Sequence, residues 1–182
     1  TVGERFEVVA TVPPQHMYGM EMSVLLPLLG NVGVHTGRPF FPGDVAAALA
    51  AVPPPRVLVT TPVHLRALIE SGIALPPIAA MVSATAPLPV ELARTAEQRF
   101  EAPLLEVFGS TETCVFASRR TTVDEDWSLY DDVTLHPQPD GTAIEAPQLG
   151  AWVTLADIVS LSHGGRRFRL CGRHADLLEI AG

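Results

Sequence analysis

The segment Val107–Glu112 combines residue types that can bind a nucleotide phosphate. It reads Val-Phe-Gly-Ser-Thr-Glu, so an aromatic ring and a glycine precede two hydroxyls and a carboxylate. A threonine hydroxyl can bond a phosphate oxygen, a glutamate can hold Mg²⁺ against that phosphate, and glycine lets a ligand approach the backbone. Hydroxyls and an acid after a strand are also common helix caps. These residues alone leave both interpretations open.

The elements around this segment predict a parallel α/β fold. Short β-branched runs alternate with alanine- and leucine-rich stretches, which is typical of βαβ units. The strands are expected at 6–12, 32–36, 57–60, 80–83 and 104–108, and the helices at 21–29, 45–52, 61–71 and 89–100. Ligands of such sheets bind at the carboxyl ends of the strands. The loops after Val12, Ser83 and Phe108 are therefore where we expect chemistry.

The sequence changes character after Ser118. Turn residues separate short alternating runs, and Asp140-Gly141 is a strong hairpin signal. Antiparallel strands are expected at 133–135, 143–145, 152–155, 158–161 and 167–170. The predicted fold class is thus α/β, a parallel sheet with flanking helices followed by a small antiparallel β-barrel-like subdomain. The predicted boundaries are 1–118 for the α/β subdomain and 119–170 for the β subdomain.

Composition excludes several classes of function. A net charge of −8 argues against a nucleic-acid partner, and the arginines at 166, 167 and 169 are interpreted as a solvated turn. No apolar run is long enough to span a bilayer, and no signal peptide is recognisable. Two cysteines without metal-like spacing favour a reduced, cytoplasmic protein. All 12 basic residues are arginine, so no mechanism within these residues can use a lysine.

The segment Val107–Glu112 resembles the aromatic-Gly-x-Thr-Glu motif of the adenylate-forming superfamily, which includes acyl- and aryl-CoA synthetases, peptide-synthetase adenylation domains and luciferases. Four other segments resemble motifs of that superfamily in the same order. They are Pro-Gln-His-Met-Tyr-Gly at 14–19, Ser-Ala-Thr-Ala-Pro-Leu at 83–88, Leu-Ala-Asp at 155–157 and Gly-Arg-His-Ala-Asp-Leu-Leu at 172–178. This order across nearly the whole chain makes the phosphate site the better interpretation.

The resemblance implies a role for each residue that matches a motif. For the nucleotide base, Thr85 and Ala86 would lie beside the adenine and Phe108 would stack on it. Gly109 would let the nucleotide approach the backbone closely, and Thr111 would contact the α-phosphate. Asp157 would bind the ribose hydroxyls, and Arg173 would bind the ribose or a phosphate. The catalytic residues would be His16, Thr111 and Glu112, with Glu112 as the Mg²⁺ ligand. Tyr18, Ala84 and Val107 would line the substrate pocket.

The resemblance also implies a reaction. A carboxylic acid attacks the α-phosphate of ATP, pyrophosphate leaves, and the acyl-adenylate passes to the thiol of coenzyme A or of a carrier protein. The protein would contribute mainly positioning and charge neutralisation. The superfamily uses a phosphate-loop lysine upstream and a lid lysine downstream, and residues 171–182 would form the hinge to that lid. With no lysine here, we expect a truncated piece that binds a nucleotide or adenylate but is nearly inactive.

Departures from the superfamily motifs suggest the type of acid. Ala84, Thr85 and Val107 stand where glycines are common, and each adds volume to the pocket. The run Val107-Phe108-Gly109 also resembles the branch of the superfamily that activates aryl acids. The added volume and this resemblance together lead us to expect a compact, aromatic acid rather than a long acyl chain. Ala175 stands where the hinge usually has Asp or Lys, and Glu179 where Lys or a polar residue is frequent.

Two functions from other classes remain open. The first is a non-catalytic module that binds a nucleotide or adenylate and lacks the lid. The second is an unrelated α/β interaction domain whose motifs are coincidental. A serine hydrolase is disfavoured because no Gly-x-Ser-x-Gly segment occurs.

Overall fold

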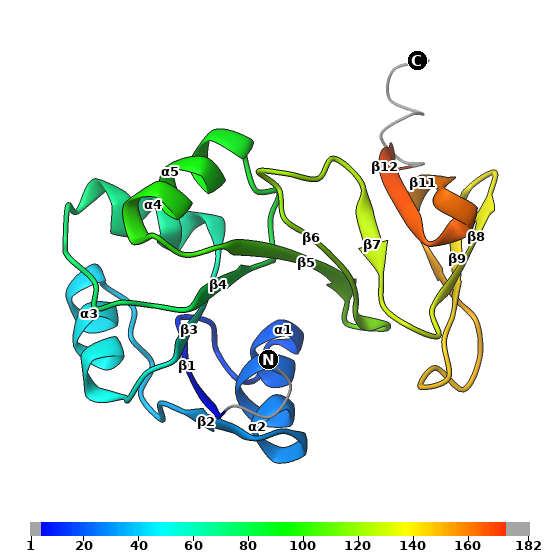
Figure 1. Ribbon diagram of the computed structural model, residues 1–182. Coiled ribbons are helices and arrows are strands. Elements are labelled where there is room, and N and C mark those ends of the chain that lie inside the picture. Colours follow the sequence, from blue (N-terminus) through cyan, green and yellow to red (C-terminus); the bar gives the residue numbers. More distant parts are fainter. Residues whose placement is uncertain (1–4, 174–182) are drawn as a thin grey trace. The chain divides into compact units, whose positions relative to one another are not determined.

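The computed structural model describes residues 5–173, which form two compact units (Figure 1). The first unit comprises Thr1–Val107 and Arg120–Val123, and the second comprises Phe108–Arg119 and Asp124–Gly182. The chain therefore passes between the units three times within a short stretch.

The first unit is built on a parallel sheet. Its strands are β1 (Phe6–Ala10), β2 (Val32–Val34), β3 (Arg56–Thr60), β4 (Ala80–Ser83) and β5 (Leu104–Ser110), of which β5 ends in the second unit. The strand order is β2-β1-β3-β4-β5, and all of these pairings are parallel. This arrangement confirms the predicted α/β class.

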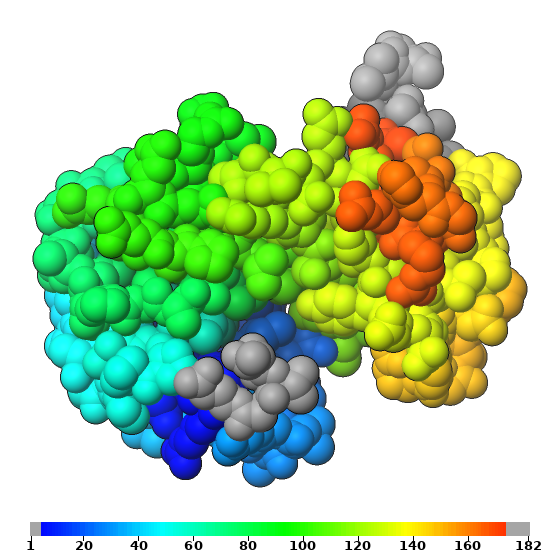
Figure 2. Space-filling model, viewed as in Figure 1, coloured from blue at the N-terminus to red at the C-terminus, as the bar shows by residue number. Residues whose placement is uncertain are grey.

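Helices follow the strands, as the sequence predicts. They are α1 (Met17–Met20), the π-helix η1 (Glu21–Leu25), α2 (Leu26–Leu29), α3 (Pro42–Ala51), α4 (Pro62–Glu70) and α5 (Val90–Phe100). In Figure 2, α5 lies in green on the outside of the first unit. It buries Ala93, Ala96 and Phe100 at helical spacing. No helix within residues 5–173 has the length and apolar character needed to cross a membrane.

The core of the first unit includes one row of apolar side chains across the sheet. Val9, Leu58, Met81 and Leu104 are neighbours in register and are completely buried. They belong to one hydrophobic cluster with residues of α3, α4 and α5. Burying such side chains stabilises the unit by about 1.5–3 kcal/mol each, so this row sets the register of the strands that lead to the expected loops.

The second unit is antiparallel. Strands β6 (Cys114–Arg119), β7 (Trp127–Leu129), β11 (Asp157–Ser162) and β12 (Arg167–Arg173) lie in the order β6-β7-β12-β11, with the 3₁₀ turn η2 (His163–Gly165) before β12. A separate sheet has the order β10-β9-β8 and consists of β8 (Thr134–Gln138), β9 (Gly141–Glu145) and β10 (Val153–Leu155). Gln138 pairs with Gly141, so the predicted hairpin forms.

Strands β6 and β7 were not expected from the sequence. Strand β7 has only three residues, and charged residues follow β6 and precede β7, which hides the apolar pattern of both strands. They form because Phe116 and Trp127 are buried in the core of the second unit, where both contact Phe168. This aromatic cluster holds the unit together through tertiary contacts that local sequence does not reveal.

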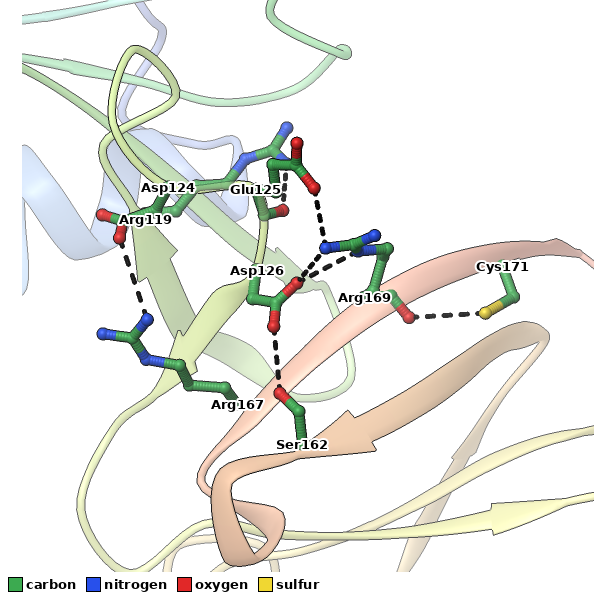
Figure 3. Close-up of polar contacts among 8 residues, drawn as sticks. All are labelled: Arg119, Asp124, Glu125, Asp126, Ser162, Arg167, Arg169 and Cys171. Atoms are coloured by element: carbon green, nitrogen blue, oxygen red, sulfur yellow. Dashed lines mark hydrogen bonds and ion pairs between the residues drawn. The ribbon is translucent and has the colours of Figure 1, made fainter.

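Ion pairs tie the acidic segment before β7 to β12 (Figure 3). Arg169 lies between Glu125 and Asp126, with a nitrogen 2.8 Å from an oxygen of each. The hydrogen bond from Arg169 lowers the pKa of Asp126. Arg167 and Arg166 pair with other aspartates of this unit. The arginines around 166–169 therefore have carboxylate partners rather than being only solvated.

Candidate functional site

The loop after β1 holds His16 at the start of α1. His16 is exposed, has extended backbone angles and makes no side-chain bond to the helix end. The next turn is anchored by Tyr18, which is buried and donates its hydroxyl to the carbonyl of Val82 at 2.8 Å. Gly19 is required because a Cβ there would lie 2.1 Å from the carbonyl oxygen of Pro13. The His-x-aromatic-Gly spacing thus presents the imidazole at the surface of the first unit.

The loop after β4 begins buried and becomes exposed. Ala84 is buried, whereas Thr85 and Ala86 are exposed. The loop returns to the core at Leu88, whose side chain is 4% exposed. The two residues assigned beside the adenine therefore lie on an exposed segment that is held at both ends.

Thr85 has a backbone conformation that glycine would adopt more easily. Its φ is +79°, in the left-handed region. A β-branched residue is rare there because its side chain crowds the backbone. The superfamily resemblance places a glycine at this position, and the backbone angle supplies the physical reason. The fold keeps that conformation even though threonine replaces the glycine.

A tight turn joins β5 to β6, so the helix-cap interpretation of this segment is wrong. Gly109 is required on the incoming strand, since a Cβ would lie 2.1 Å from the carbonyl oxygen of Cys114. The buried hydroxyl of Thr113 accepts the backbone N–H of Ser110 at 3.1 Å and donates to the carbonyl of Cys114 at 3.0 Å. The hydroxyl oxygens of Ser110 and Thr113 also lie 3.1 Å apart.

Thr111 and Glu112 lie exposed within this turn. A hydrogen bond from Ser110, together with the backbone N–H of Glu112 itself, lowers the pKa of the Glu112 carboxyl. The turn therefore presents a hydroxyl beside a carboxylate that stays ionised at neutral pH. The contribution of Ser110 and Thr113 was not predicted, although the run Ser-Thr-Glu-Thr contains an unusual density of hydroxyls.

Phe108 lies against the aromatic core of the second unit. Its ring centroid is 5.3 Å from that of Phe116 and 5.2 Å from that of Trp127, and the side chain is half-buried. The ring is therefore held by its neighbours while part of it remains accessible. Val107, the last residue of the first unit before this point, is buried.

Asp157 and Arg173 are brought together by the pairing of β11 with β12. They are opposite each other in the antiparallel register, and Arg173 Nε donates to Asp157 Oδ1 at 3.1 Å. The hydroxyl of Thr142 donates to the backbone carbonyl of Asp157 at 2.7 Å, which ties the start of β11 to β9. Two residues that are 16 positions apart in sequence thus form one ion pair.

The predicted site residues divide between the two units. His16, Tyr18, Ala84, Thr85, Ala86 and Val107 belong to the first unit, whereas Phe108, Gly109, Thr111, Glu112, Asp157 and Arg173 belong to the second. Within the units, the structure joins Asp157 to Arg173 and anchors Tyr18 on β4. The hinge residues Ala175 and Glu179 lie outside the described residues.

The residues present suit a metal that arrives with a phosphate. Within residues 5–173, no group of three or more His, Cys, Asp or Glu side chains can hold a metal ion. Glu112 by contrast offers one exposed, ionised carboxylate beside a hydroxyl. Mg²⁺ is commonly bound by one or two carboxylates together with substrate phosphates and water, so this donor set fits it.

Comparisons with known proteins agree with this arrangement. The chain is 30% identical to a 4-coumarate–CoA ligase of Halorhodospira halophila over 188 aligned positions, covering 100% of this chain and 44% of that protein. The chain therefore spans less than half the length of this relative.

Solved structures share the fold. A benzoate CoA ligase from Burkholderia xenovorans LB400 matches with a TM-score of 0.75 and 21% identity, over 95% of this chain and 42% of that one. The O-succinylbenzoate coenzyme A synthetase of Bacillus subtilis, solved with ATP and magnesium ion, matches with a TM-score of 0.79 and 15% identity, over 96% and 43%. The sequence model of the AMP-binding enzymes matches residues 1–144. The chain belongs to the AMP-binding enzyme family.

Proposed function

We propose that this chain is part of an ATP-dependent ligase that activates a carboxylic acid as an acyl- or aryl-adenylate and passes it to a thiol. The observation that carries the proposal is the turn Ser110–Thr113, which presents a hydroxyl and an ionised carboxylate on a hydrogen-bonded frame. Such a frame is prepared for a phosphate before the nucleotide arrives, and preorganised groups contribute most to charge stabilisation.

This proposal gives a role to Thr111 and Glu112 of the turn and to His16 of the loop after β1. The hydroxyl of Thr111 donates to an α-phosphate oxygen. The Glu112 carboxylate would hold a Mg²⁺ ion, which when bound would neutralise phosphate charge. The exposed imidazole of His16 borders the acid carboxylate and the phosphate. An oxygen of the substrate acid's carboxylate forms a bond to the α-phosphorus of ATP, and the bond between the α-phosphorus and the pyrophosphate leaving group breaks.

The nucleoside contacts come from residues that the fold already constrains. Asp157 is oriented by its bond to Arg173 and accepts hydrogen bonds from the ribose hydroxyls. Phe108, supported on its other side by the aromatic cluster, offers its accessible part to the adenine. Thr85 and Ala86 lie beside the adenine on the exposed part of their loop.

For the acid, the proposal is a compact aromatic carboxylate, with coenzyme A as the thiol. Ala84 and Val107 replace glycines with larger side chains and are both buried, which favours a short pocket. The names of the relatives point the same way, since they refer to coumarate, benzoate and O-succinylbenzoate and to coenzyme A. A carrier-protein thiol is the alternative acceptor.

Binding of an acyl-adenylate analogue to the 182-residue chain tests the proposal. We expect calorimetry with a benzoyl sulfamoyl adenosine to detect binding, and Asp157→Ala to weaken it about tenfold to a hundredfold, as for a hydrogen bond to a charged group. Asp131→Ala is the matched control, because it removes another aspartate–arginine ion pair of the second unit that is not assigned to the site. Equal affinity in both variants would contradict the proposed role of Asp157.

Turnover is tested on any longer polypeptide that includes these 182 residues. We expect pyrophosphate exchange to depend on added acid and to be faster with hydroxybenzoates than with palmitate. The 182 residues alone are expected to bind without exchange, because they contain no lysine to act on the phosphates. Exchange at a comparable rate by these residues alone would refute that expectation, and binding without exchange in the longer polypeptide would favour a non-catalytic module.

A further inference from the structure

A buried polar row crosses the carboxyl end of the first unit's sheet. It consists of Thr11, Thr60, Ser83 and Glu106, each at most 6% exposed. Thr60, Ser83 and Glu106 are partners in register, and the hydroxyl of Thr11 donates to that of Thr60 at 3.1 Å. The row lies two residues beyond the apolar row of Val9, Leu58, Met81 and Leu104, on the same face of the sheet.

Polar side chains at such a position carry a free-energy cost unless they form hydrogen bonds. Glu106 satisfies this condition with both of its oxygens. Oε1 accepts the backbone N–H of Leu88 at 3.0 Å, and Oε2 accepts the hydroxyl of Thr121 at 2.8 Å. One buried carboxylate therefore joins β5 to two other segments of the first unit.

The segment joined through Leu88 is the loop that carries Ala84, Thr85 and Ala86. Thr85 adopts its left-handed conformation in this loop, and such strain persists only where the surrounding structure over-determines it. The loop is held by the buried side chain of Leu88 and by the bond of its N–H to Glu106. Losing that bond would let the exposed part of the loop relax.

We propose that Glu106 is a positioning residue for adenylate binding, which holds the Ala84–Leu88 loop in its binding conformation, and that Thr121 orients its carboxylate. This inference rests on the proposed function. It adds a residue outside the predicted motif positions, one that acts through the loop rather than by touching the ligand.

The adjacent residue, Thr122, provides a matched control. Its hydroxyl donates to Glu97 Oε2, also at 2.8 Å, so it forms the same type of bond with a carboxylate of the same unit. Glu97 in turn bonds the N–H of Leu104 and the side chain of Arg120, and none of these belongs to the site loops. Thr121→Val and Thr122→Val thus each remove one hydroxyl–carboxylate bond of 2.8 Å, and only the first affects Glu106.

The experiment measures the affinity of the 182-residue chain for benzoyl sulfamoyl adenosine and the hydrogen exchange of the Leu88 amide. We expect Thr121→Val to weaken binding about threefold to tenfold, the range that corresponds to one ordinary hydrogen bond, and to speed exchange at Leu88. Thr122→Val should change neither property, although it should also lower the unfolding midpoint. Glu106→Gln should retain most of the affinity, because its amide can still accept from Leu88.

Adding Thr85→Gly to Thr121→Val separates positioning from general stability. Glycine removes the strain in the loop, so the double variant should recover part of the lost affinity. Equal losses in the two threonine variants, or unchanged affinity and exchange in Thr121→Val, would overturn the inference and leave the proposed function intact. Absence of analogue binding by the unsubstituted chain would overturn both.

Discussion

The loop Ala84–Leu88 and the turn Ser110–Thr113 carry site residues of the two units and are stabilised in opposite ways. The loop is held from outside, by the buried side chain of Leu88 and by the carboxylate of Glu106. The turn is held from within, because Ser110 and Thr113 bond each other and the local backbone. The conformation of the Ala84–Leu88 loop therefore depends on residues distant in the sequence, whereas that of the Ser110–Thr113 turn depends on its own residues.

Glycine illustrates the same difference. The turn retains Gly109 where two backbones come within contact distance, and no other residue fits there. The loop has lost its glycine, and Thr85 occupies a left-handed conformation in its place. The loop is anchored firmly enough to keep Thr85 in a strained conformation, while a larger residue than glycine at position 109 would clash with the backbone of Cys114.

The largest effect is expected for Gly109→Ala. The added Cβ would collide with the backbone of Cys114, so we expect a loss of about 3 kcal/mol in the free energy of unfolding. Urea denaturation followed by circular dichroism measures it. Gly150→Ala is the control in the same unit, since nothing lies within 4 Å of its Cβ position. A loss as small as that of the control would mean that the turn can move away from the clash.

Thr113→Val should have the next largest effect. It removes a buried hydroxyl that accepts from Ser110 and donates to Cys114, which we expect to cost about 1–3 kcal/mol in the free energy of unfolding. Thr154→Val, at an exposed position of β10, should stay within about 0.5 kcal/mol of the unsubstituted chain. Chemical denaturation measures the free energy of unfolding of both variants. Equal values would show that the hydroxyl of Thr113 does not stabilise the turn.

Thr85→Gly should stabilise the first unit slightly. Relief of the left-handed strain should raise the free energy of unfolding by about 1–2 kcal/mol. The greater freedom of glycine in the unfolded chain should lower it by about 0.5–1 kcal/mol. The net gain should therefore be about 0–1.5 kcal/mol in the free energy of unfolding, measured by thermal or urea unfolding. Thr85→Ala keeps a Cβ at the same backbone angle and should gain less. A destabilised glycine variant would mean that the side chain of Thr85 makes a favourable contact.

The smallest effect concerns the titration of Glu112. Its pKa is lowered by the hydrogen bond from Ser110, so the carboxylate loses its charge only as the pH falls through this lowered value. Ser110→Ala should move the pKa of Glu112 back toward the ordinary glutamate range, and Mg²⁺-dependent nucleotide binding should then be lost at a higher pH. A carboxyl-detected NMR titration measures the change. Identical titration curves would assign the lowered pKa to the backbone alone.

Much of the architecture follows from local sequence. Alternating apolar strands and amphipathic helices predict the parallel sheet, because burial of one face requires that periodicity. The spacing from His16 to Gly19 and from Phe108 to Glu112 indicated the loops that hold candidate site residues. These patterns depend on neighbouring residues, and neighbouring residues can be read directly from the chain.

The sequence by itself therefore determined the α/β class, the family motifs and the loops in which they lie. Only the tertiary structure decided that the Phe108–Glu112 segment turns into β6 rather than capping a helix, and that Asp157 meets Arg173. It also revealed the bonds from Leu88 and Thr121 to Glu106. The physical reason is distance along the chain: a buried carboxylate is stable only with its donors, and those donors come from segments that meet only in the folded sheet.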